Sequence, residues 1–362
     1  MRENILTYAK SEKRSLEEHP LGEVDSLILS WLGYLHYPSS VPAFSSWEGI
    51  SLEEASTKWL HKGLFRGLYG EERTRLLYEA VAANPRFSAL RILAFREEVD
   101  EERQMQFAAV SFLLPDGSCY VSFRGTDSSL VGWKEDFNMA YECPVPSQER
   151  AKRYLEEVAS HCQGPLHVGG HSKGGNLAVY ASVMAHKAVR DRIEDIHSHD
   201  GPGFPSLFYR LEEYLEMAPR IVKTVPQSSL FGLIMNADQP ITIVKSDSVS
   251  FLQHYPFSWR IADGDFVRQD HLTADAIYFD QVCDYILSNL TRSERELFVD
   301  SVYDLIKSLG FSKANNAMLL MPYIGAKYVA MVKEAKEPDK SRFEKILDVL
   351  KKAILPGQRE ER

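Results

Sequence analysis

The serine at position 172 is the residue of this sequence best placed to do chemistry. It stands between two glycines in the run Gly170-His171-Ser172-Lys173-Gly174. The spacing Gly-x-Ser-x-Gly is typical of a nucleophile elbow, a sharp strand-to-helix turn that exposes a serine hydroxyl. Such a hydroxyl attacks a carbonyl carbon once a base removes its proton. The motif therefore predicts covalent acyl chemistry at Ser172.

The residues on both sides of the serine favour such a turn. Residues 165–168 have the pattern of a short buried strand, and apolar residues recur at helical spacing from Leu177 to Met184. A Cβ at Gly170 or Gly174 would collide where the strand and the helix pack backbone against backbone. The alternative is an ordinary glycine-rich turn with an incidental serine.

A serine nucleophile also needs a carboxylate that orients its base. In hydrolases with this elbow the acid follows the serine and precedes the histidine. Asp200 comes after an expected strand at 193–198 and opens a Gly-Pro turn, which favours it as the acid. The rival is Asp247, just after an expected strand at 241–245. Asp200 could instead be a turn or capping residue, since aspartate favours such places.

The base should lie downstream of both acids, where the sequence offers His254 and His271. His254 lies in an aromatic loop after the last expected strand, whereas His271 lies in a charged stretch before a helix. We therefore predict His254 as the base. His171, inside the elbow, is expected to shape the turn.

The tetrahedral intermediate of acyl transfer needs N–H donors for its oxyanion. The N–H of Lys173, directly after the nucleophile, is the expected first donor. Thr126 follows an expected strand end and could supply the second, through its N–H and its hydroxyl. Glu135 and Asp136 are expected to anchor Arg124 and so stiffen this loop.

These residues need a scaffold, and strands alternate with helices from about residue 148 to 245. This alternation indicates a mostly parallel sheet with helices on both faces. The expected strands 107–113 and 119–123 are joined by Pro-Asp-Gly, a hairpin signal, which predicts antiparallel strands at one edge. The sequence thus predicts an α/β-hydrolase fold.

Further helices are expected before and after this alternating region, at 22–36, at 52–84 and from about residue 274 onward. We expect residues 1–362 to form a single domain, with a core at about 20–290 and a C-terminal helical extension at 291–362.

Composition limits the partners of the chain. Its 362 residues carry a net charge of −9, which argues against a nucleic-acid partner because phosphate neutralisation needs a basic surface. No cluster of histidine or acidic residues has metal-ligand spacing, so neither a metal nor a cofactor is expected. The four cysteines show no CxxC spacing, as expected of reduced thiols in a cytoplasmic protein.

The longest apolar run, Ala317 to Ala326, contains Pro322 and Gly325 and is too short to span a bilayer. The N-terminal residues lack the apolar segment of a secretory signal. We therefore expect a soluble cytoplasmic protein without a transmembrane segment, which leaves peripheral membrane contact open. The sequence does not specify an oligomeric state.

Two motifs together resemble a known family. Phe-Arg-Gly-Thr at 123–126, followed by Gly-His-Ser-Lys-Gly at 170–174, looks like the class 3 lipase branch of the α/β-hydrolases. The longer string 169–178, with Gly-Trp-Lys-Glu-Asp at 132–136 and Asp-Gly-Pro-Gly-Phe at 200–204, is similar to a bacterial lipase-like family called Mbeg-like. The resemblance covers roughly residues 20–290.

The resemblance implies Ser172 as the nucleophile and Thr126 and Lys173 as oxyanion donors. Class 3 lipases usually carry their acid one strand later, near an Asp-x-Val-Pro sequence. The matching stretch here, Lys223–Pro226, has no aspartate. This departure favours Asp200, as in pancreatic-type lipases.

The predicted function is a serine hydrolase that cleaves a small-molecule or lipid carboxylic ester through an acyl-enzyme. The alternatives are a non-catalytic scaffold that binds a lipid or a partner protein, and an acyl-thioesterase or acyltransferase. One set of apolar residues could line an acyl pocket or could equally be packed in the core: Leu230, Phe231, Leu233, Ile234, Met235, Phe257 and Trp259.

Overall fold

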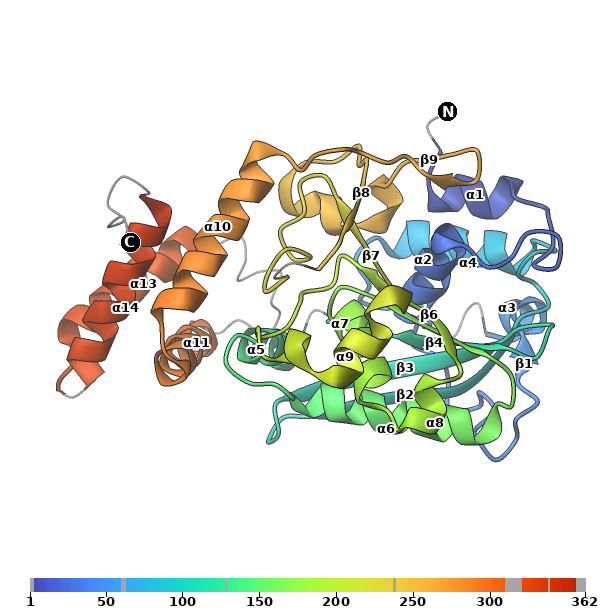
Figure 1. Cartoon of the computed structure of the whole chain (residues 1–362), viewed down its shortest axis with the longest axis horizontal. Coiled ribbons are helices and arrows are strands. Elements are labelled where there is room, and N and C mark those ends of the chain that lie inside the picture. The colour runs from blue at the N-terminus through green and yellow to red at the C-terminus, as the bar shows by residue number, and fades with distance from the viewer. Residues whose placement is uncertain are drawn as a thin grey trace.

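The computed structural model describes residues 3–59, 63–127, 129–236, 239–309, 321–337 and 339–355. Parts of the expected helical extension, and residues 317–320 of the apolar run, lie outside these ranges. A central sheet occupies one side of the molecule, and the C-terminal helices extend beyond it (Figure 1). No helix within the described ranges is both long and apolar enough to cross a bilayer.

The main sheet has eight strands, which lie side by side in chain order from β1 to β8. The first four strands pair antiparallel, and each pair from β4 to β8 is parallel. The predicted parallel sheet with an antiparallel hairpin at one edge is therefore confirmed. The strands are β1 (Ile50–Ser51), β2 (Arg91–Asp100), β3 (Met105–Leu113), β4 (Cys119–Phe123), β5 (Leu166–His171), β6 (Ile193–His199), β7 (Ile221–Pro226) and β8 (Thr242–Val244), with a small second sheet of β9 (Ile261–Ala262) and β10 (Asp265–Phe266).

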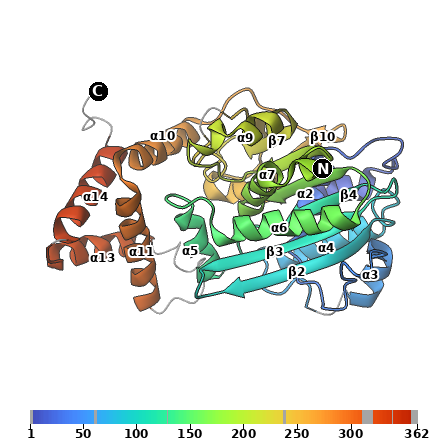
Figure 2. The same ribbon diagram turned by 60° about the horizontal axis from the view of Figure 1, so that its bottom comes forward.

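Helices cover both faces of the main sheet, as predicted. Side chains alternate between the two faces of a strand, so in β4 Tyr120 packs in one apolar cluster and Val121 in another. The first cluster includes α2 (Glu23–Leu32), and the second includes α6 (Pro146–His161) and α7 (Lys173–Met184). Figure 2 shows α6 running alongside β3, which it contacts. The remaining helices of this part are α1 (Ile5–Ser11), α3 (Leu52–Trp59), α4 (Glu71–Ala82), α5 (Leu130–Asn138), α8 (Lys187–Arg190) and α9 (Glu212–Met217), with short 3₁₀ turns η1 (Phe208–Arg210), η2 (Ala218–Arg220), η3 (Ser250–His254) and η4 (Pro256–Ser258).

The C-terminal helices pack against one another and have an apolar cluster of their own. Leu290, Tyr328, Phe343 and Ile346 belong to this cluster. Polar contacts also connect these helices to the rest of the chain, among them the ion pair between Lys134 of α5 and Asp300, at 2.7 Å. The helices are α10 (Ala274–Asn289), α11 (Arg292–Ser308), α13 (Met321–Glu334) and α14 (Asp339–Ile354).

Candidate active site

Ser172 lies in the turn between β5 and α7, with backbone angles of φ +59° and ψ −134°. Residues other than glycine rarely adopt this conformation, which costs about 1–3 kcal/mol and is common at functional sites. The flanking glycines allow the turn. A Cβ at Gly170 would overlap with the carbonyl group of Gly174, and one at Gly174 would overlap with the carbonyl oxygen of Phe123. The local geometry is that of the elbow that the glycine spacing predicts.

Asp200 follows β6 directly and is fully buried beneath the segment 229–232. Its Oδ2 accepts a hydrogen bond from Nδ1 of His254 at 2.6 Å. Its Oδ1 accepts from the hydroxyl of Ser229 and from the N–H of Gly232, the latter at 3.1 Å. Both carboxylate oxygens are therefore engaged, and the orientation of Asp200 is fixed.

The pKa of Asp200 reflects two opposing effects. Burial alone would raise it, since burial disfavours a charged carboxylate. The hydrogen bond and the charge of His254, with the hydrogen bond from Ser229, more than offset burial and bring the pKa below its usual value. Asp200 is thus an ionised carboxylate at neutral pH, although it is shielded from water.

His254 is the last residue of η3, and its side chain is 21% exposed. The ring of Phe231 lies 4.4 Å from the imidazole, measured between centroids. Because Nδ1 donates to Asp200, Nε2 is the nitrogen that can accept a proton. Among the described residues the Ser172 hydroxyl has no hydrogen-bond partner, so contact with His254 is not closed in this structure. Such contacts often tighten only when substrate binds.

His171 holds the backbone of the His254 loop. Its Nε2–H donates to the carbonyl oxygen of His254 at 2.8 Å, and its Nδ1 accepts from the hydroxyl of Tyr34 at 3.0 Å. Burial, with the nearby His254 as a second cause, lowers the pKa of His171 to about 3. A neutral His171 therefore connects the elbow to the loop that carries His254.

The buried state of His171 predicts acid sensitivity. An unfolded imidazole binds a proton below pH 6.5, whereas folded His171 stays neutral down to about pH 3. The unfolded chain then binds more protons, so stability falls as the pH drops below 6.5. At about pH 5 the loss from this group should be about 2 kcal/mol. Urea midpoints at pH 8 and pH 5 should show a smaller loss in His171→Gln than in the wild type. The exposed His271→Gln serves as the control, and equal losses in all three proteins would contradict the prediction.

The loop after β4 lies directly against the elbow. A Cβ at Gly125 would lie 3.0 Å from Cβ of Ser172 and 2.6 Å from the carbonyl oxygen of His171. The hydroxyl of Thr126 donates to Asp136, at 2.7 and 2.6 Å from its two carboxylate oxygens. This hydrogen bond leaves the backbone N–H of Thr126, rather than its hydroxyl proton, for an oxyanion. Within the described ranges the N–H groups of Thr126 and Lys173 have no acceptor.

The side chain of Lys173, directly after the elbow serine, is buried, and only 1% of it is exposed. Its ammonium group lies 2.9 Å from Glu135 and donates to the carbonyl oxygen of Gln106 at 2.8 Å. The carboxylate of Glu135 also accepts the N–H groups of Gln106 at 3.0 Å and Ser147 at 2.8 Å. A buried ion pair therefore joins the start of α7 to α5 and β3.

The expected pairing of Arg124 with Glu135 and Asp136 is wrong. Arg124 instead binds Glu97 of β2 at 2.6 Å, while Glu135 binds Lys173. Side-chain alternation explains the difference. Tyr120 and Ser122 face α2, and Arg124, two residues on, continues on that face. Glu135 instead binds Ser147 of α6, a helix that packs in the other apolar cluster.

The structure places the rival acid and base elsewhere. Asp247 forms an ion pair with Arg260 at 2.6 Å, and His271 is exposed. Of the apolar residues considered for an acyl pocket, Phe257 and Trp259 are buried in the core cluster beside α2. No group of three or more histidine, cysteine, aspartate or glutamate residues in the described part of the chain is arranged to hold a metal ion.

Sequence reasoning missed the residues that support the pair Asp200 and His254. Ser229 and Gly232 come from an irregular segment after β7, which has no periodic pattern. The available signal was the Pro226 turn with two serines after it. Tyr34, which donates to His171, follows the end of α2 and carried no signal.

The consecutive strand order, the antiparallel edge and the elbow at the end of β5 define a lipase-like α/β-hydrolase fold. The chain belongs to the Mbeg1-like family, whose model matches residues 81–304, more than half of the sequence. The predicted family membership is therefore confirmed. A search of curated proteins found no match.

Several solved lipase structures resemble parts of this chain. M37 lipase has a TM-score of 0.37 at 12% identity, over 60% of this chain and 71% of its own. The Rhizomucor miehei lipase–propeptide complex has a TM-score of 0.36 at 14% identity, over 63% of this chain and 75% of its own. Lip2 lipase from Yarrowia lipolytica has a TM-score of 0.36 at 10% identity, over 66% of this chain and 92% of its own. The likeness is partial, whereas the strand order and the elbow define the fold of this chain.

Proposed function

We propose that this protein is a serine hydrolase that cleaves carboxylic esters through an acyl-enzyme. The observation that carries the proposal is the 2.6 Å hydrogen bond between His254 and the buried Asp200, in a chain with a strained elbow at Ser172. An ionised carboxylate on Nδ1 orients a histidine so that Nε2 serves as a base. The membership in the Mbeg1-like family is consistent with this function.

In the proposed reaction, Nε2 of His254 takes the proton of the Ser172 hydroxyl as Oγ attacks the ester carbonyl carbon. The oxyanion that forms accepts the N–H groups of Thr126 and Lys173. The intermediate then collapses, the ester C–O bond breaks, and the alcohol leaves with the proton from His254. Water, deprotonated by His254, attacks the acyl-enzyme and releases the carboxylic acid and the free serine.

Each of these contacts has a task in the proposed reaction. Asp200 stabilises the imidazolium that forms on His254. His171 and Phe231 hold the His254 loop and ring in place. Asp136 accepts the hydrogen bond of the Thr126 hydroxyl, so that the backbone N–H remains the oxyanion donor. The Lys173–Glu135 pair fixes the first turn of α7, where the N–H of Lys173 lies.

Labelling with a fluorophosphonate probe tests the proposal, because the probe reacts only with an activated serine. We expect the wild type to be labelled, Ser172→Ala to lose labelling completely, and a control, Ser160→Ala on the exposed end of α6, to keep it. An unlabelled wild type would favour a non-catalytic scaffold. Labelling that survives in Ser172→Ala would place the nucleophile elsewhere.

We also infer that residues 1–362 act as one domain with a helical extension at the C-terminal end. The support is the pair of connections from α11 to the core, the Lys134–Asp300 ion pair and the hydrogen bond of 2.8 Å from Arg295 to the carbonyl oxygen of Ala140.

A further inference from the structure

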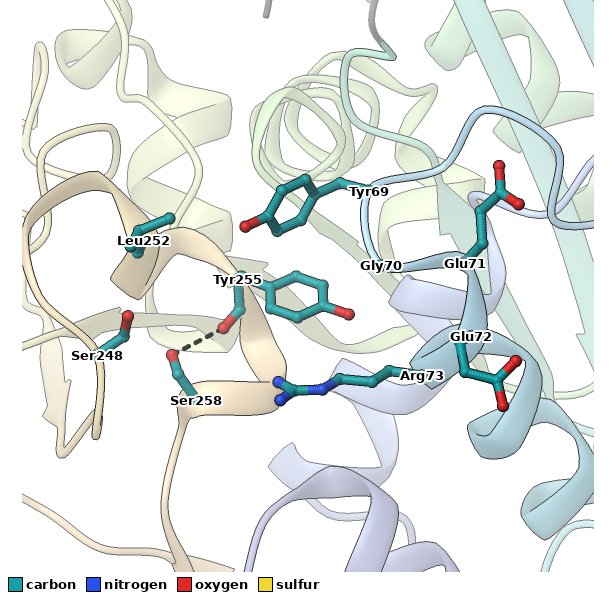
Figure 3. A pocket seen from close by; sticks show the side chains of 9 residues that line it. All are labelled: Tyr69, Gly70, Glu71, Glu72, Arg73, Ser248, Leu252, Tyr255 and Ser258. Atoms are coloured by element: carbon teal, nitrogen blue, oxygen red, sulfur yellow. Dashed lines mark hydrogen bonds between the residues drawn. The ribbon is translucent and has the colours of Figure 1, made fainter.

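A surface cleft of about 530 Å³ lies between the start of α4 and the segment that carries His254. Figure 3 shows its two walls. Tyr69 and Arg73 come from the α4 side, and Ser248, Leu252 and Tyr255 come from the other. The proposed mechanism uses none of these side chains, so the cleft is a feature in its own right.

Arg73 gives the cleft a free positive charge. In Figure 3 its guanidinium group points across the cleft toward Tyr255 and Ser258. No carboxylate in the described part of the chain lies within ion-pair distance of it. An exposed guanidinium without an ion-pair partner is suited to a planar, bidentate contact with a carboxylate or phosphate.

The two carboxylates of the cleft are already engaged. Glu72 pairs with Arg75 at 2.6 Å, and Glu71 accepts the N–H of Gly67 at 2.7 Å. Both side chains turn away from the wall that contains Tyr255 (Figure 3). The charge presented to a ligand is therefore that of Arg73.

The cleft also has an apolar part and a free hydroxyl. The rings of Tyr69 and Tyr255 meet edge to face, with centroids 5.0 Å apart, and Tyr69 is 59% exposed. Leu252 is 38% exposed beside them. The Ser248 hydroxyl has no partner among the described residues, whereas that of Ser258 donates to the carbonyl oxygen of Tyr255 at 2.8 Å. Such a lining fits a ligand with one anionic group and an apolar portion.

The cleft adjoins the candidate active site. Tyr255 follows His254 directly in the chain. The ring of Trp31 lies 5.4 Å from the ring of Tyr255 and 5.4 Å from that of His171. One aromatic side chain therefore separates the cleft wall from the elbow.

We propose that this cleft binds the anionic head group, a carboxylate or a phosphate, of an amphiphilic ester whose ester bond Ser172 attacks. The head group pairs with Arg73, and the adjacent apolar portion lies on Tyr69, Leu252 and Tyr255. This inference rests on the proposed hydrolase function and specifies its substrate as an acidic amphiphile rather than a neutral ester.

Binding is measured first, on the Ser172→Ala protein, so that the result does not depend on catalysis. Calorimetric titrations use octyl phosphate, octanoate and the neutral octyl glycerol ether. We expect at least one anion to bind about tenfold more tightly than the neutral ligand, and the tighter anion identifies the head group. Adding Arg73→Gln should remove this preference, Arg73→Lys should keep part of it, and the exposed Arg153→Gln on α6 should keep all of it.

Equal binding of charged and neutral ligands, or a preference that survives Arg73→Gln, would overturn the inference. Kinetics then compare a monoacylglycerol with its phosphate. We expect the ratio of kcat/KM, phosphate over neutral, to fall about tenfold in Arg73→Gln. If both esters are cleaved and the ratio does not change, the head-group inference fails while the hydrolase stands. If anions bind through Arg73 and neither ester is cleaved, the proposed hydrolase function fails.

Discussion

Replacing Asp200 by asparagine is expected to lower kcat/KM for a p-nitrophenyl ester by roughly 10⁴-fold, the order seen when a triad carboxylate is neutralised. The physical reason is local. On the proposed mechanism, the 2.6 Å hydrogen bond to Nδ1 of His254 is the contact that fixes the tautomer and stabilises the imidazolium. An amide can present its NH₂ to Nδ1 and so favour the wrong tautomer, with the proton on Nε2.

The rival acid provides a matched control for this experiment. Asp247→Asn removes the same charge from the segment after β8, where Asp247 binds Arg260 at the surface. We expect its activity to remain within about twofold of the wild type. Full activity in Asp200→Asn together with a large loss in Asp247→Asn would reassign the acid to Asp247.

The substitution Lys173→Met is expected to lower the free energy of unfolding by about 3–5 kcal/mol, because it leaves a buried charge without its partner. Glu135 is 0% exposed and would keep only its two N–H donors, from Gln106 and Ser147. Urea denaturation measures the loss. Replacing the unpaired carboxylate by an amide, with Glu135→Gln in the same protein, should recover part of the lost free energy of unfolding.

An exposed ion pair is the control for this buried one. Lys187 pairs with Asp191 at 2.7 Å, with side chains 67% and 54% exposed. Solvent screens such a pair, so Lys187→Met should change the urea midpoint very little. If Lys173→Met cost no more than Lys187→Met, the buried pair would not contribute to stability as its burial implies.

The sheet was predictable from the sequence because its strands are buried and short, with turn signals between them. The expected strand at 119–123 matches β4, and that at 193–198 falls one residue short of β6. Parallel strands covered on both faces read as apolar runs, and helices between them show their own period. The glycines at 170 and 174 added the elbow, because only a residue without a side chain fits there.

The contacts around the candidate site were less predictable, because they depend on which face a side chain takes. Glu135 and Arg124 are close in sequence, yet they bind different partners, Glu135 binding Lys173 and Arg124 binding Glu97. The segment that covers Asp200 has no periodic pattern, so the only signal for its donors Ser229 and Gly232 was the Pro226 turn with two serines after it. Phe257 and Trp259 had the composition of a pocket lining, but tertiary packing places them in the core.

The strands of the main sheet also lie in the order in which a ribosome makes them. Each new strand can pair with the one made just before it, which keeps the closed loops short and the contacts local. This order allows the serine at 172 to join the growing sheet before the residues around position 254 have been synthesised. On the proposed mechanism, a half-made chain carries a nucleophile without a base, and hydrolysis can begin only after translation has passed His254.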